Sequence, residues 1–497
     1  MAKVSFSFND EYDVAEPSAS AMIESLRAFG YNIQTAIADL IDNSISAKAQ
    51  NIWTKFNWNG VNSFISISDD GTGMTGKVLV NAMRPGSHNP LSVRNPLDLG
   101  RFGLGLKTAS FSQCRRLTVA SRTSNSPVAI RRWDLDYVNQ TDEWRLLHSP
   151  APGSEKPLTG LDNMPQGTIV LWECLDRIVG DARVEDRKAQ ENFLETIAIV
   201  EKHLAMVFHR YLEGRGRVKI WINDRPVEAW DPFLTGERAT QWLPEEPFCN
   251  RKVIVQPYVL PHHSKIDETT HRYAAGPKGW NAQQGFYIYR NQRLLVAGDW
   301  LGLGFQKEEH CKLARIQVDL PNTMDTSWNI DVKKSRARPP AALREDLKRI
   351  ARITRREATA IYRHRGKVIT RKNADDYVFP WERKIRRGKV FYAVNHQHPL
   401  IQEAQNIPKE YQPTIRAMLR LLEETVPVQQ IWLDSSDKPD SHTQPFEGVP
   451  TKEVVEVINQ IYQSLRNTGL TAQQARLQLL AMEPFQHFEE LIQNLPD

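Results

Sequence analysis

Three short segments rich in carboxylates, amides and glycines follow one another between residues 38 and 108. The first lies where apolar residues recur every three or four positions from residue 33 to about 47, which predicts an amphipathic helix. The second follows two stretches of alternating apolar and polar residues, 51–57 and 63–68, which predict a β-hairpin. In the third, glycines precede apolar residues of helical spacing. A helix followed by antiparallel strands favours an α+β sandwich.

The first segment reads Ala-Asp-Leu-Ile-Asp-Asn-Ser at residues 38–44. Asp39 and Asn43 are four positions apart, so their side chains share one face of a helix. A carboxylate on that face could orient a water molecule, and an amide oxygen could bind a hard cation such as Mg²⁺. Taken alone, the segment also fits the acidic side of an ordinary amphipathic helix.

The second segment places Asp69, Gly71, Gly73 and Met74 directly after the second predicted strand. Glycines let the backbone approach a ligand closely, and a carboxylate can accept a hydrogen bond from an exocyclic amine such as that of adenine. A plain hairpin turn is the alternative interpretation of this segment.

The third segment combines three glycines with an arginine and a lysine. Its candidate ligand-binding residues are Gly100, Arg101, Phe102, Gly103, Leu104, Gly105 and Lys107. Backbone amides left free at the start of a helix form an anion site suited to phosphates. On its own, such a pattern also fits a tight loop.

In this order the three segments resemble the motifs of the GHKL ATPases, named for gyrase, heat-shock chaperone, histidine kinase and MutL, whose nucleotide domain has the Bergerat fold. The resemblance implies that Asp39 is the general base, Asn43 the Mg²⁺ ligand and Asp69 the carboxylate that reads adenine. It also implies that Gly71 and Gly73 line the base.

Further along, the resemblance implies that Gly100, Gly103 and Gly105 wrap the phosphates at the end of a flexible lid over about residues 76–102. A Gly-Thr pair at residues 167 and 168 resembles the last strand motif of the family. There the Thr168 hydroxyl would support the contact with adenine.

One residue departs from the family pattern, because ATPase members usually have Glu where this chain has Asp39. Asp is shorter by one methylene, so the water must lie closer or be held partly by another group, and turnover is expected to be slow. Asp42 is an alternative base, although it points to a different side of the helix from Asn43.

MutL and gyrase have a transducer domain after the nucleotide domain, with a lysine that reaches the γ-phosphate. Comparison with MutL puts Lys334 at that position, with Lys333 as a close alternative; both could instead simply open a basic helix. Residues 17–365 resemble the MutL/MORC-like prokaryotic branch, whose members often accompany restriction and phage-defence genes. This resemblance implies a homodimer that closes when ATP binds.

The pattern of elements divides the chain into three parts of mixed α+β class. We expect a Bergerat α/β sandwich at residues 1–185 and a ribosomal-fold, transducer-like domain with a long basic helix at 186–368. A mostly helical C-terminal region of unknown role should occupy 369–497. The first boundary rests on a new strand expected at 218–222, after a helical stretch at 191–212.

Basic residues are concentrated in one segment of the chain. From Lys333 to Lys389 there are twenty Lys and Arg against six Asp and Glu, a net charge of 20 − 6 = +14, so the remainder carries 5 − 14 = −9. Such asymmetry favours an anionic partner, with DNA the common case, and a solvated helix face is the alternative.

Membrane and metal features are few in the sequence. No apolar run approaches the ~20 residues that span a bilayer, and no signal pattern is present, so we expect a cytoplasmic protein. Four separated cysteines without a Cys-x-x-Cys pair argue against zinc and disulfides and fit buried thiols. His396 and His398 suggest a metal pair but fit a structural role better, and Trp381 could stack on bases but fits a small aromatic core better.

The sequence therefore predicts an ATP-hydrolysing, Mg²⁺-dependent, dimerising switch that acts on DNA or on DNA-processing partners such as a nuclease, in phage defence or restriction. A chaperone-like ATPase acting on protein clients is an alternative that the basic segment disfavours. A nucleotide-sensing module with little turnover is kept open by the shorter side chain of Asp39. A histidine kinase is disfavoured, because no phosphoacceptor helix precedes the first segment.

Overall fold

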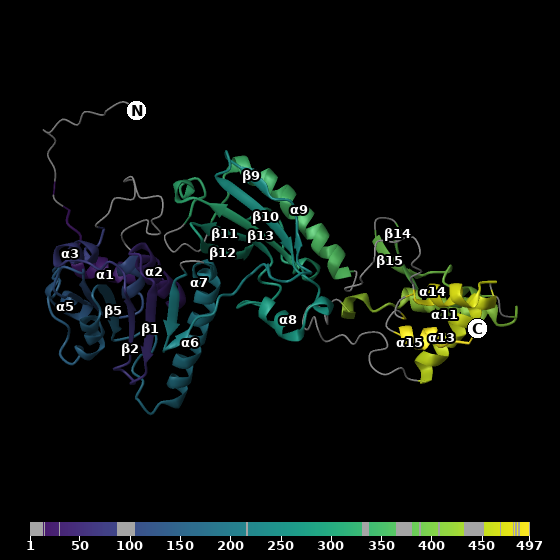
Figure 1. Cartoon of the computed structure of the whole chain (residues 1–497), viewed down its shortest axis with the longest axis horizontal. Helices are drawn as coiled ribbons and strands as arrows, with labels where there is room; N and C mark the ends of the chain where they lie inside the picture. The colour runs from purple at the N-terminus through teal and green to yellow at the C-terminus, as the bar shows by residue number, and fades with distance from the viewer. Residues whose placement is uncertain are drawn as a thin grey trace. The chain divides into compact units, whose positions relative to one another are not determined.

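The computed structural model describes residues 13, 15–28, 30–86, 105–214, 217–330, 337–363, 380–386, 389–405, 408–431, 452–467, 469–480, 482, 485 and 488–496. The chain divides into two compact units, Met1–Gly366 and Lys367–Asp497 (Figure 1). Among the described residues, the first unit holds a seven-stranded and a six-stranded sheet, and the second holds a two-stranded sheet.

The seven-stranded sheet has the order β4-β3-β5-β2-β1-β6-β7. Its strands are β1 Asn51–Asn57, β2 Phe64–Asp69, β3 Arg116–Arg122, β4 Ala129–Asp134, β5 Gly167–Glu173, β6 Lys219–Ile222 and β7 Arg225–Pro226. The hairpin predicted from alternation is confirmed, because β1 and β2 pair antiparallel with Asn57 opposite Phe64. The mixed α+β class is confirmed by the helices that accompany this sheet.

Helices are packed on this sheet through apolar stripes. They are α1 Ala19–Arg27, α2 Ile33–Ser46, α3 Gly76–Met83, α4 Gly105–Phe111, α5 Leu135–Thr141, α6 Arg187–Val207 and α7 His209–Leu212, with a 3₁₀ helix, η1, at Lys156–Asn163. In α2, Ile37, Leu40 and Ile41 are buried in the core. The helix begins at the cap residue Asn32, whose side chain accepts a hydrogen bond from the Thr35 amide.

Strand β6 differs from the expected organisation. It pairs in parallel with β1, with Ile52 opposite Ile220, and so extends the first sheet instead of opening a new one. The boundary expected near residue 185 therefore falls before the last strands of that sheet. Alternating residues at 218–222 predict a strand, but they do not say which sheet the strand joins.

The six-stranded sheet has the order β12-β11-β13-β10-β8, and β9 also pairs with β10. Its strands are β8 Gln241–Trp242, β9 Glu246–Phe248, β10 Val253–Val259, β11 Gly285–Arg290, β12 Arg293–Asp299 and β13 Ala314–Leu320. Shorter helices lie between them, namely η2 His263–Lys265, α8 Glu268–Ala274, η3 Glu309–Cys311 and η4 Asn322–Met324. The predicted basic helix is α9, Ala341–Arg363, which lies along β10 and β13 (Figure 1).

The second unit combines a hairpin with helices. Its elements are β14 Trp381–Arg386, β15 Lys389–Val394, α10 Pro399–Gln405, α11 Gln412–Glu424, α13 Lys452–Asn467, α14 Ala472–Leu480 and α15 Glu489–Gln493. The prediction of an aromatic core at the hairpin is wrong, because Trp381, Phe391 and Tyr392 are all exposed. A two-stranded ribbon offers little surface to pack against, and the core is formed by helical residues such as Ile458 and Leu479.

Two further expectations concern cysteines and membranes. Cys114 and Cys311 are buried thiols, whereas Cys249 is exposed because it lies in a turn with Asn250 and Arg251, all three at positive φ. Among the described residues, no helix has the length and apolarity that crossing a membrane requires.

Candidate functional site

The first and third sequence segments meet at Asp39 on α2. Its side chain is only 3% exposed, and its Oδ2 accepts a hydrogen bond of 3.0 Å from the Tyr31 hydroxyl. A Cβ added to Gly105, the first residue of α4, would lie 3.7 Å from the same oxygen. One turn further along α2, Asn43 is exposed. The predicted base thus lies beside the start of α4, and the predicted Mg²⁺ ligand remains accessible.

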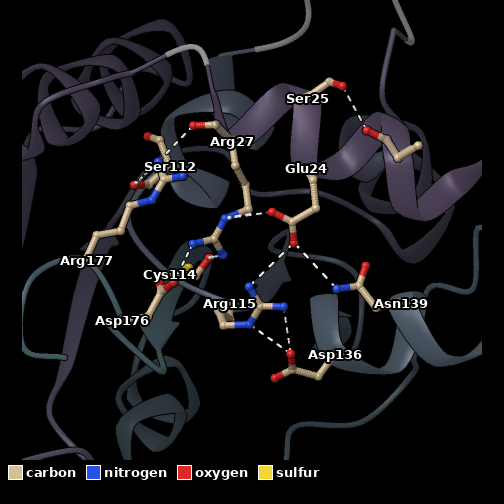
Figure 2. Close-up of polar contacts among 11 residues, drawn as sticks. Glu24, Ser25, Arg27, Ser112, Cys114, Arg115, Asp136, Asn139, Asp176 and Arg177 are labelled. Atoms are coloured by element: carbon tan, nitrogen blue, oxygen red, sulfur yellow. Dashed lines mark hydrogen bonds and ion pairs between the residues drawn. The ribbon is translucent and has the colours of Figure 1, made fainter. Parts of the chain in front are cut away.

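The position of Tyr31 is set by the end of α1, which a network of charged side chains attaches to its neighbours (Figure 2). Arg27 is buried and pairs with Asp176 at 2.5 Å, while Arg177 donates to the Arg27 carbonyl at 2.8 Å. Gln113 donates to the Tyr31 carbonyl at 2.8 Å. The backbone on either side of the tyrosine is therefore anchored.

Asp69 is the last residue of β2, and its buried carboxylate accepts two hydrogen bonds. Its Oδ2 accepts a hydrogen bond of 2.8 Å from the Ser44 hydroxyl, and its Oδ1 accepts one of 2.9 Å from the Gly71 amide. Burial raises the pKa of Asp69 to about 6, and the two hydrogen bonds oppose that shift. The carboxyl group therefore titrates near neutral pH and is ionised only in part at pH 6.

The end of β2 is joined to β5 by the pairing of Asp69 with Thr168. The Thr168 hydroxyl lies 2.8 Å from that of Ser121 on β3, which also accepts from the Met74 amide at 2.8 Å. These hydroxyls connect the predicted threonine to Met74, and strand pairing places the predicted adenine carboxylate opposite the threonine.

Glycines in this region are required by close approach of backbone to backbone. Gly73 has φ +65°, and a Cβ there would lie 1.8 Å from the Arg122 carbonyl oxygen. A Cβ on Gly167 would lie 2.2 Å from the Asp69 carbonyl oxygen, and one on Gly71 would lie 2.9 Å from the side chain of Ala47. These contacts account for the three glycines without a ligand, so the role of Gly71 and Gly73 in lining adenine stays a prediction.

Lys107 of the predicted phosphate segment lies in α4, with its ammonium directed to α3. It is 2% exposed, and its Nζ donates to the Ala82 carbonyl in α3 at 2.8 Å. Burial lowers the pKa of this ammonium to about 8. The hydrogen bond described for this ammonium is thus with the protein backbone. Several other predicted residues lie outside the described residues: Gly100, Arg101, Phe102, Gly103, Leu104, Lys333 and Lys334.

Asp42, the alternative base, lies on a different side of α2 from Asn43. Its side chain is fully buried and pairs with the Arg293 Nε of β12 at 3.1 Å. Of the two carboxylates of α2, Asp39 thus lies beside α4 and Asp42 contacts the second sheet.

Residues 31–168 match the family model described as histidine kinase-, DNA gyrase B- and HSP90-like ATPase. This match supports a GHKL fold for this part of the chain. A domain of that family suggests ATP binding and hydrolysis. The matched range contains Asp39, Asn43, Asp69 and Thr168. No curated protein matches the chain.

Four residues that contact predicted site residues or the alternative base Asp42 were not predicted from the sequence: Tyr31, Ser44, Ser121 and Arg293. Ser44 directly follows Asn43, so its place in the first motif could have indicated that it belongs to the site. Tyr31 lies eight residues before Asp39 and precedes α2, so no helical spacing relates the two residues. Arg293 is 251 residues away from Asp42, and only tertiary structure joins the two.

Possible metal sites elsewhere are weaker. Among the described residues, one group of side chains lies close enough to share an ion, namely Glu308, His310 and Cys311. Arg355 already pairs with the Glu308 carboxylate at 2.5 Å, which disfavours a cation there. Of the two tail histidines, His398 is buried and His396 is exposed, and they do not form such a group.

Proposed function

We propose that this chain binds and hydrolyses ATP at the surface formed by α2, the end of β2 and the start of α4. One observation carries the proposal. The buried Asp39 carboxylate lies beside Gly105 at the start of α4 and one helical turn from the exposed amide of Asn43. A proton acceptor, a hard oxygen ligand and a helix that begins with glycine therefore come together in the region that matches the ATPase family.

Asp69 has the chemistry needed to select adenine. Each of its oxygens accepts one hydrogen bond from the protein and keeps a lone pair for a further donor such as the exocyclic amine. Ser44 and Gly71 hold the carboxyl group in one orientation, so it is preorganised. Thr168 lies on the neighbouring strand, directly opposite, where its hydroxyl can support the same contact.

The donor set also fits Mg²⁺, because the exposed Asn43 offers an amide oxygen of the hard type that this ion prefers. When bound, Mg²⁺ would neutralise charge on the phosphates. Asp39 would accept the proton of the attacking water, and the Tyr31 hydroxyl would orient the carboxylate.

A second candidate is a nucleotide-sensing module with little turnover. The observation that favours it is the short side chain of Asp39, which is already engaged by Tyr31 and must reach a water molecule with one methylene fewer than Glu. The two candidates share the binding step and differ only in the rate of phosphate release.

We further propose that nucleotide binding drives a switch on DNA or on DNA-processing partners, in the manner of the MutL/MORC-like branch. This includes a homodimer in the ATP state, a γ-phosphate contact from Lys334 or Lys333, and a place in phage defence. The support is charge: α9 carries seven Lys and Arg against three Asp and Glu, a net 7 − 3 = +4. A polybasic helix favours a polyanion over the protein clients of a chaperone.

The test is phosphate release by the full chain, with and without Mg²⁺ and with and without duplex DNA. We expect Mg²⁺-dependent turnover that DNA raises, and a loss of about 100-fold or more in Asn43→Ala. Ser46→Ala, at the exposed last residue of α2, is the matched control and should behave like the parent. Turnover that is unchanged in Asn43→Ala would contradict the site. ATP binding without turnover would select the sensing module.

A further inference from the structure

The hairpin of β11 and β12 lies between two buried ion pairs. Its turn residues, Asn291 and Gln292, both have positive φ, the geometry of a tight two-residue turn that matches strand twist. Arg290 and Arg293 are directly opposite each other across this turn. The turn thus fixes the separation of the two arginines within a short and rigid unit.

Each arginine of this hairpin binds a different part of the molecule. Arg293 pairs with Asp42 of α2 at 3.1 Å, with both side chains nearly inaccessible to solvent. Arg290 pairs with Asp325 at 3.2 Å, also in a buried position. Asp325 directly follows η4 and precedes Lys333 and Lys334 by eight and nine positions in the sequence.

Helix α7 fixes the same hairpin from the side of the first sheet. Tyr211 donates to the Asn291 carbonyl at 2.5 Å, and His209 contacts the Tyr289 hydroxyl at 2.8 Å. The Arg293 guanidinium also lies 4.8 Å from the centre of the Phe208 ring. These contacts hold the hairpin against the first sheet, and among its described contacts the one with Asp42 joins it to the helix that carries Asp39.

A buried ion pair resists separation in a way that an exposed one does not. Removing either partner leaves an uncompensated charge away from water, so the two elements move together. Any displacement of α2 is then passed to the hairpin through Arg293 and from the hairpin to Asp325 through Arg290.

We propose that the Arg290–Arg293 hairpin couples the nucleotide state of α2 to the Asp325 segment, with Arg293 as the contact that joins the hairpin to α2. This inference rests on the proposed function, because it needs a nucleotide at that helix. It assigns to the hairpin the regulation of the Asp325 segment, which leads to the two candidate lysines.

The experiment is amide hydrogen exchange of the full chain with and without ATP and Mg²⁺, together with a separate measurement of ATP affinity. In the parent, we expect nucleotide to slow exchange in residues 320–330 by about fivefold or more. In Arg293→Met, nucleotide should no longer slow exchange in these residues, while ATP affinity stays within about threefold of the parent.

Arg210→Met is the matched control, because Arg210 pairs with Asp319 at 2.5 Å and lies over the Tyr289 ring of β11, but has no described contact with α2. It should keep the protection. If Arg293→Met does not fold, the double variant Asp42→Asn and Arg293→Met removes both buried charges and should still lack the protection. Arg293→Lys keeps the charge and should restore part of it.

Several outcomes would overturn the inference. They are protection retained in Arg293→Met, protection lost equally in Arg210→Met, or ATP binding in the parent without protection of 320–330. The last leaves ATP binding intact and removes only the coupling. A parent that binds no ATP would remove the proposed function itself, and the affinity measurement distinguishes this case from the others.

Discussion

Helices α2 and α9 are both amphipathic, but their charged residues face opposite ways. In α2, the charged side chains point inward: Asp39 is 3% exposed and contacts Tyr31, which precedes the helix, and Asp42 is fully buried and contacts Arg293 of β12. In α9, Leu347 and Ile350 pack on the second sheet, while Arg349 and Arg356 face solvent.

The difference shows what each helix can do. Buried carboxylates with fixed partners act on a single ligand at short range, because a low dielectric strengthens their interactions. Exposed arginines act together as a field that attracts any polyanion and weakens with salt. Chemistry is therefore expected from α2 and partner attraction from α9.

The largest effect should come from breaking the buried pair of α2. Arg293→Met removes the guanidinium that faces the buried Asp42 carboxylate, so the free energy of unfolding should fall by about 3–5 kcal/mol. Adding Asp42→Asn removes the second charge and should recover most of that loss. Urea unfolding of the parent and both variants is the measurement. If Arg293→Met were as stable as the parent, the buried pair of α2 would contribute no more to stability than an exposed pair of α9.

The second effect concerns Asp69, whose pKa burial raises to about 6 from the usual 3.8. The folded state then binds the proton more tightly than the unfolded state, so this group stabilises the fold most below pH 4. The stabilisation declines as pH rises through 6, by roughly 3 kcal/mol in all.

Asp69→Asn, a neutral isostere, should flatten this dependence and should be more stable than the parent at pH 7. It should also bind ATP more weakly, because an amide oxygen is a poorer acceptor than a carboxylate. Unfolding curves at pH 4 to 7 measure the first effect, and equilibrium ATP binding measures the second. Parallel stability profiles in parent and variant would contradict the raised pKa.

Neutralising α9 should alter DNA affinity without altering the nucleotide site. Replacing Arg349, Arg352 and Arg356 by Gln should weaken duplex binding about tenfold at moderate salt and reduce the salt slope by about two to three. ATP affinity should stay the same. Fluorescence anisotropy across a salt series is the measurement.

The control for that triple variant is an equal charge change elsewhere on the surface. Arg145, Arg225 and Arg272 are exposed and lie outside α9, and their replacement by Gln should leave the DNA salt slope unchanged. Equal losses in the two triple variants would show that net charge, and not α9, governs DNA binding.

The smallest effect should come from the exposed pair of Arg349 on α9 with Glu246 on β9, which are 2.5 Å apart and 46% and 31% exposed. Solvent screens such a pair, so its coupling energy should be about 0–1 kcal/mol. A double-mutant cycle with Arg349→Gln and Glu246→Gln measures it. A coupling as large as that of Asp42 and Arg293 would remove the distinction between the two helices.

Local periodicity predicted α2, β1 and β2, because apolar residues recur at helical spacing in the first and alternate with polar residues in the other two. The family resemblance assigned Asp39 and Gly105 to one nucleotide site, and the two residues lie next to each other. These features depend on neighbours in the chain or on a family pattern carried by short motifs.

Features that depend on distant contacts were not predictable. The strand at 219–222 joins the first sheet through β1, a partner some 168 positions earlier, and alternation gives no information about that choice. The burial of Asp42 depends on Arg293, and the exposure of Trp381 depends on how little packs against its hairpin. In each case tertiary packing decided what local composition left open.

The measurement that tests the account most directly is ATP turnover by Asp39→Asn compared with Asp39→Glu and the parent, at saturating ATP and Mg²⁺. Asn keeps the acceptor for Tyr31 but cannot take a proton, so turnover should fall by about 100-fold or more with ATP affinity within about threefold. Glu restores the missing methylene and should match or exceed the parent. Turnover by Asp39→Asn at the parental rate would contradict the assignment of Asp39 as the group that activates water.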